Sequence, residues 1–112
     1  MLVDMTLAKD HLRVDPDSAD TSVSVYLGAA QEQAEAFLNR RVYAKPEDLA
    51  AAVLNGSAGI DPMVVNDSIR AAILLILGHL YANREDVGLQ QAYELPMGAR
   101  SLLWPYRVGL GV

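Results

Sequence analysis

The sequence predicts an all-α fold, a small helical bundle, and three observations carry the prediction. From Ile69 to Tyr81 almost every residue is apolar, so no side of a helix there would be polar, as expected for a buried helix. An earlier stretch repeats its apolar residues at steps of three and four, the spacing of an amphipathic helix. Strand signals are weak throughout, and 112 residues correspond to one domain.

A short first helix is expected over residues 6–12. Thr6 is the expected N-cap, because its hydroxyl can accept a bond from a backbone N–H of the first turn. Leu7 and Leu12 are expected to face the core. Pro16 then interrupts the helical pattern, because proline disfavours helical angles at the residue before it.

A long amphipathic helix is expected over about residues 20–41. Its apolar seam consists of Val23, Leu27, Ala30, Ala34 and Phe37, widened by Tyr26 and Leu38. Arg40 and Arg41 are expected in its last turn, where positive charge complements the helix dipole. A contact with nucleic acid is the alternative for this pair.

A short helix is expected over residues 46–54, with Pro46 at its first position and Asn55-Gly56 as its stop. Asp61 and Pro62 are expected to cap and begin the central apolar helix, over about residues 62–85. Its uncharged run, residues 71–82, is too short to span a bilayer, which takes about 18–20 apolar residues. The central helix is therefore expected to lie in the core.

The last part of the chain is expected to be less regular. Residues 86–94 have no strong period and are expected to form a loop, and residues 95–98 a turn. A short helix is expected over residues 99–104, stopped by Pro105. The expected organisation is a helical domain, residues 1–107, followed by an extended C-terminal tail, residues 108–112.

Composition excludes several classes of function. The net charge of −5 argues against a clamp that neutralises DNA phosphates, although DNA could pass through such a protein without sticking. The absence of cysteine excludes disulfides, thiolate zinc sites and a cysteine nucleophile. The N-terminus lacks a basic region followed by an apolar core, so cytoplasmic synthesis without a signal peptide is expected.

The sequence predicts no catalytic, cofactor-binding or metal-binding residues. The only histidines, His11 and His79, are far apart and lack the helical spacing of metal ligands. His79 is expected to be a hydrogen-bonded core or interface residue. Paired carboxylates, such as Glu47 with Asp48, occur where a helix cap or a solvated turn explains them.

The triplet Asp67-Ser68-Ile69 suggests an alternative function. It resembles the Asp-Ser-Leu triplet of acyl carrier proteins, whose serine carries phosphopantetheine. Here Arg70 and an apolar run follow the serine, in place of an acidic recognition helix. A role for Ser68 as a cap or first-turn residue is therefore favoured, and a small acidic carrier or adaptor module is kept as the alternative.

Three blocks of the sequence, taken in order, match the pattern of one known family. Residues 5–15 are similar to its opening "T-L-x-x-A-K-x-H-L-R-V-D", and residues 67–85 to its "I-x-x-A-I-L-L-L-x-x-H-x-Y-x-N-R-E" helix. Residues 95–107 are close to its ending, "L-P-x-G-x-x-x-L-L-x-P-Y-R". The chain thus resembles the head–tail connector (adaptor, head-completion) proteins of tailed bacteriophages, with least similarity over residues 46–59.

The resemblance implies a structural virion protein that is not an enzyme and needs no cofactor. Family members form a homo-oligomeric ring, typically of twelve subunits, between the portal protein and a tail-side stopper or tail-completion protein. The ring extends the DNA channel for genome retention and passage, without sequence-specific binding and without a membrane. The implied location is the neck of the virion, at the portal vertex, after assembly in the host cytoplasm.

By the same analogy, the C-terminal segment is the candidate for contact with the portal. The candidates are Leu103, Trp104, Tyr106, Arg107, Val108, Leu110 and Val112. Trp, Tyr and Arg are the residue types enriched at interface hot spots. The alternative is that Trp104 folds back to cap the bundle. Candidates for contact between subunits are Tyr81, Asn83, Arg84 and Glu85, with the polar end of a helix as the alternative.

Overall fold

The computed structural model describes residues 2–13, 22–59, 61–82 and 95–108 and confirms the all-α class. The helices are α1 (Met5–Leu12), α2 (Ser22–Leu38), α3 (Pro46–Asn55), α4 (Asp67–Ala82), α5 (Met97–Leu103) and the 3₁₀ helix η2 (Trp104–Tyr106). The strands β1 (Val42–Tyr43) and β2 (Met63–Val64) form one small parallel sheet. Within the described ranges, no helix has the length and apolarity needed to cross a membrane.

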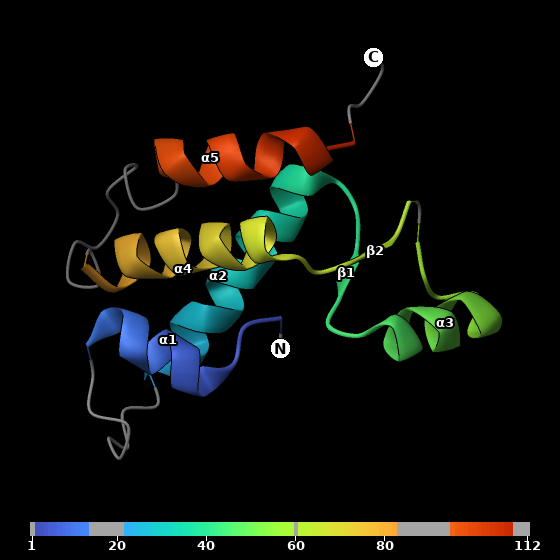
Figure 1. Cartoon of the computed structure of the whole chain (residues 1–112), viewed down its shortest axis with the longest axis horizontal. Helices are drawn as coiled ribbons and strands as arrows, with labels where there is room; N and C mark the ends of the chain where they lie inside the picture. The colour runs from blue at the N-terminus through green and yellow to red at the C-terminus, as the bar shows by residue number, and fades with distance from the viewer. Residues whose placement is uncertain (1, 14–21, 60, 83–94, 109–112) are drawn as a thin grey trace.

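Helix α4 is the centre of the bundle, and α2, α5 and α1 pack around it (Figure 1). Its residues Ile69, Ile73, Ile76 and Leu77 are fully buried. They share one buried cluster with side chains from three other segments: Val3, Leu27, Leu38 and Leu103. Helices of the same chain therefore cover most of the apolar surface of α4, although Leu75 remains 39% exposed.

The start of α4 differs from the prediction. The helix begins at Asp67, whereas Pro62 was expected to begin it. Asn66 is the cap, since its Oδ1 accepts the backbone N–H of Ile69 at 2.9 Å. Residues 83–85, at the predicted end of this helix, lie outside the described residues, as does the predicted loop over residues 86–94.

The residues expected in the first turn of α4 instead form β2. Met63 pairs with Val42, and its N–H donates to the carbonyl of Arg41 at 3.0 Å. The N–H of Val65 donates to the carbonyl of Tyr43 at 2.8 Å. The helical prediction was wrong here because the pairing partner lies about twenty residues away, and local patterns do not report such a partner.

The apolar seam of α2 is confirmed, but the end of the helix is not. Val23, Leu27, Ala30, Ala34 and Leu38 are buried, with Tyr26 and Phe37 partly buried beside them. The helix ends at Leu38, because Asn39 adopts a left-handed φ of 57°. Arg40 and Arg41 therefore lie beyond the helix, and their predicted place in its last turn was wrong.

The first helix begins earlier than its predicted cap, Thr6, allows. Met5 is its first residue and Asp4 its N-cap, so the prediction of Thr6 as the cap was wrong. Leu7, expected in the core, is 42% exposed, because the buried face of α1 centres on Ala8. Leu12 does pack against the core.

The two remaining helices lie close to their predicted positions. α3 extends one residue beyond the expected 46–54, and Gly56 ends it with a left-handed φ of 78°. α5 covers residues 97–103, where 99–104 was expected. Pro105 ends the α-helix as predicted, but the chain continues through it as η2.

Two glycines should respond oppositely to replacement by alanine. Gly28 lies within α2, and an added Cβ would meet nothing within 4 Å. Gly28→Ala is expected to raise the free energy of unfolding by about 0.5–1 kcal/mol, because glycine loses more chain entropy in a helix. Gly56→Ala should lower it by about 1 kcal/mol, because alanine is strained at positive φ. Urea denaturation measures both, and changes of the same sign would contradict this account.

Candidate functional site

The carboxyl end of α2 leaves backbone carbonyls without helical partners. A helix ends with several C=O groups that no intrahelical N–H can reach. At Asn39 the chain turns away in the left-handed conformation, which places the carbonyls of Phe37 and Leu38 at this end. Water or another segment of the chain can supply donors for them.

The C-terminal segment supplies those partners. Arg107 donates its Nε–H to the carbonyl of Phe37 at 2.9 Å. The backbone N–H of Val108 donates to the carbonyl of Leu38, also at 2.9 Å. Residues about seventy positions apart in the sequence are thus joined at the end of α2.

Two side chains of the α2 end bond back to the C-terminal segment. Asn39 donates from Nδ2 to the carbonyl of Val108 at 3.1 Å. Arg40 donates from Nη1 to the carbonyl of Tyr106 at 3.1 Å and from Nε to the carbonyl of Asp61. We call residues 37–40 and 104–108 together the C-terminal clasp. Its four bonds between these two segments fix the chain as far as Val108.

Aromatic stacking adds to the clasp. The guanidinium carbon of Arg107 lies 5.0 Å from the ring centroid of Phe37 and 5.7 Å from that of Trp104. Both distances are within the range of cation–π attraction, about 6 Å. The two rings lie 6.3 Å apart at 46°. Trp104 remains 61% exposed, so its ring borders the clasp and also presents a large surface to solvent.

The predicted portal-contact residues that the structure describes differ in their exposure to solvent. Leu103 is fully buried and belongs to the core of this chain. Trp104 and Arg107 are exposed on the clasp, and Tyr106 and Val108 are partly buried in it. Leu110 and Val112 lie outside the described residues.

The predicted inter-subunit residues are described only in part. Tyr81, in the last turn of α4, meets Tyr26 of α2 edge-on, with ring centroids 6.1 Å apart at 89°. Asn83, Arg84 and Glu85 lie outside the described residues. Of these four residues, the structure therefore describes Tyr81 alone, and its side chain is partly buried against its own bundle.

The sequence prediction missed Phe37, Asn39 and Arg40 as parts of the clasp. Arg40 was assigned to the helix dipole, but its guanidinium bonds two carbonyls beyond the helix. One signal was available: an asparagine directly after an apolar helical seam is a typical helix stop. Nothing local indicates which segment then bonds to the helix end.

The chemistry of the described surface suits contact with other macromolecules. No polar or charged side chain in the described ranges is buried, and no group of acids, histidines or cysteines in them could hold a metal ion. Ser68 is partly buried in the first turn of α4. The clasp instead combines exposed tryptophan and arginine, which are common anchors of protein interfaces.

A comparison with protein families identifies this chain's relatives. A family model described as "Phage gp6-like head-tail connector protein" matches residues 4–107, nearly the whole chain. The chain belongs to this head–tail connector family. No curated protein and no solved structure matches it. The matched range contains all the described helices and ends at Arg107, inside the C-terminal clasp.

Membership gives the connector a structural role in the virion of a tailed bacteriophage, of a non-enzymatic kind. This role favours the connector function over the carrier alternative based on Ser68, which requires covalent modification. The family match thus confirms the resemblance carried by the three sequence blocks.

Proposed function

We propose that this connector assembles as a homo-oligomeric ring between the portal protein and a tail-side stopper or tail-completion protein. The ring, which we expect to contain about twelve subunits by analogy with the family, is closed by rotation about one axis. It prolongs the DNA channel in the neck of the virion and acts in genome retention and passage. It carries out no catalysis, and subunits assemble in the host cytoplasm.

The C-terminal clasp is the observation that carries this proposal. It holds the chain firmly through Val108, so that residues 109–112 start from a fixed point at the end of α2. Trp104 and Arg107 are exposed beside that point. A rigidly held segment loses less conformational entropy on binding, which favours affinity. The portal-contact surface is therefore Trp104, Tyr106, Arg107, Val108 and the tail, with Leu103 supporting it from the core.

Charge supports the proposed passage of DNA. The chain carries 14 acidic and 9 basic residues, a net charge of −5. A ring of such subunits repels the phosphate backbone overall, which limits adhesion of DNA during passage. Tyr81, Asn83, Arg84 and Glu85 remain our candidates for contacts between neighbouring subunits.

Truncation of the tail tests the portal contact. Removal of residues 109–112 keeps the clasp and is expected to reduce attachment to portal-bearing capsids at least tenfold. Removal of residues 108–112 should do the same and also destabilise the end of α2, because two clasp bonds are lost. Co-sedimentation with capsids measures attachment, and circular dichroism reports the fold. Wild-type attachment by both truncated proteins would refute the tail contact.

A further inference from the structure

Helix α3 exposes apolar side chains that its own chain does not cover. Leu54 is 89% exposed and Val53 is 58% exposed, both near the carboxyl end of the helix. α3 packs mainly against β1 and β2, and it stands apart from the other helices (Figure 1). A helix of this length is marginal in water without tertiary packing. A further packing partner for this end would stabilise it.

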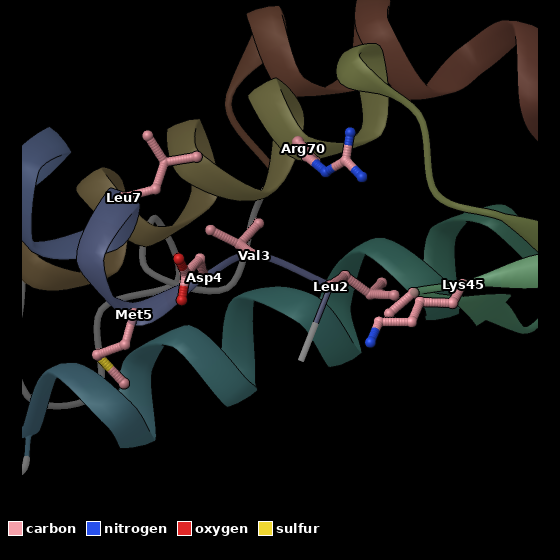
Figure 2. Close-up of a pocket in the computed structure, with 8 residues that line it drawn as sticks. Leu2, Val3, Asp4, Met5, Leu7, Lys45 and Arg70 are labelled. Atoms are coloured by element: carbon pink, nitrogen blue, oxygen red, sulfur yellow. The ribbon is translucent and has the colours of Figure 1, made fainter. Parts of the chain in front are cut away.

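A groove on the same chain has the complementary character. It has a volume of about 540 Å³ and lies between the start of α1, the segment after β1, and α4 (Figure 2). Its apolar wall is formed by Leu2, Val3, Met5 and Leu7, with Ala44 beside them. Leu7 is the apolar residue of α1 that remains 42% exposed. Figure 2 shows Lys45 and Arg70 at the edge away from Leu7.

The charges of the two surfaces also match. The last turn of α3 has no basic residue, so no side chain of the helix offsets the negative end of its dipole beside Val53 and Leu54. The groove offers Lys45 and Arg70 against a single acid, Asp4. Arg70 is paired with Asp67 at 3.0 Å, but that carboxylate is fully exposed, so the pair is weak and Arg70 can exchange partners.

The two surfaces lie at opposite ends of α3. Lys45 directly precedes the helix, whereas Leu54 is at its far end, so the helix cannot fill its own chain's groove. A projecting helix end and a groove at different places on one chain make a heterologous, head-to-tail contact. Such a contact closes into a ring when the rotation between copies allows it.

We propose that the carboxyl end of α3 inserts into this groove on a second copy of the chain. Val53 and Leu54 pack on the apolar wall around Leu7, and Lys45 and Arg70 face the carbonyl end of the inserted helix. This inference rests on the proposed ring and names one contact that joins its subunits. It also gives a role to α3, which lies within residues 46–59, the part of the chain with least similarity to the family pattern.

Disulfide trapping tests the contact directly, because the chain has no cysteine of its own. Oxidation of the double variant Leu7→Cys/Leu54→Cys is expected to produce a ladder of covalent oligomers, in solution or on portal-bearing capsids. A mixture of the two single variants should give mixed dimers only. Dimers of Leu54→Cys alone would indicate contact between two α3 helices, and absence of any mixed product would equally overturn the inference.

A charged substitution separates this inference from the proposed function. Leu54→Glu is expected to reduce ring formation at least tenfold while leaving the circular dichroism spectrum unchanged, because Leu54 is almost fully exposed. Val25→Glu is the matched control, since Val25 is 69% exposed on α2 and remote from both surfaces in sequence. Analytical ultracentrifugation and negative-stain imaging with portal measure the rings.

The outcomes distinguish the two proposals. Rings formed equally by the wild type and by Leu54→Glu overturn the α3 contact and leave the ring intact. A wild-type protein that forms no ring at any concentration, with or without portal, overturns the proposed ring and the contact together. Loss of rings in both Leu54→Glu and Val25→Glu would show a general effect of added charge and would also count against the α3 contact.

Discussion

Replacing Ile73 by alanine is expected to lower the free energy of unfolding by about 2–5 kcal/mol. Ile73 is fully buried at the middle of α4, the helix on which α1, α2 and α5 pack. Alanine would remove apolar contacts and leave a cavity that the surrounding helices fill only in part. Since a small domain has a total stability of about 5–15 kcal/mol, the variant should be partly unfolded at moderate temperature. Urea denaturation measures the loss.

Leu75→Ala is the matched control for Ile73→Ala. Leu75 lies on the same helix and is of similar size, but it is 39% exposed. Its loss should cost well under half as much, because truncation removes less buried area. Equal losses for the two variants would contradict the assignment of the Ile73 face as the centre of the core.

Replacing Arg107 by alanine is expected to open the C-terminal clasp. The variant loses the bond to the carbonyl of Phe37 and both aromatic contacts, at a combined cost of about 1–2 kcal/mol. Hydrogen exchange at the backbone N–H of Val108 should then be about tenfold faster or more, because its bond to Leu38 opens more often. Attachment to portal-bearing capsids should weaken together with this protection.

Two further variants show whether the geometry of Arg107 or its charge matters. Arg107→Lys keeps the charge but not the planar group that stacks on the rings, so intermediate protection of Val108 is expected. Arg100→Ala removes an exposed guanidinium from α5 and should leave that protection unchanged. Unchanged exchange at Val108 in Arg107→Ala would refute the clasp as the anchor of the tail. Weakened attachment with unchanged exchange would instead indicate direct contact of Arg107 with the portal.

The elements predicted best are those with local causes. The seam of α2 follows from apolar residues at helical spacing, and burial of Val23, Leu27, Ala30 and Ala34 confirms it. α3 lies within one residue of its expected bounds, because proline favours its first position and Gly56 its end. The three matched blocks likewise led to the family that the comparison confirms.

The errors occur where a residue's partner is distant in the sequence. Met63 and Val64 were assigned to the central helix, but pairing with β1 holds them in a strand. Arg40 was assigned to a helix end, but carbonyls of Asp61 and Tyr106 accept its bonds. Local propensity is a weak preference, and such tertiary bonds outweigh it.

By itself, the sequence determined the helical class, the buried face of α2, the place of α4 in the core, and the connector family. The sequence of α4 also indicated that other segments must bury this helix on several sides, because nearly all of its residues are apolar. Only the tertiary structure decided that α1, α2 and α5 cover it, and that the C-terminal segment bonds to the end of α2. Helical periodicity records which face of an element is buried. It carries no record of which distant segment buries that face or donates hydrogen bonds to the unpaired carbonyls at its end.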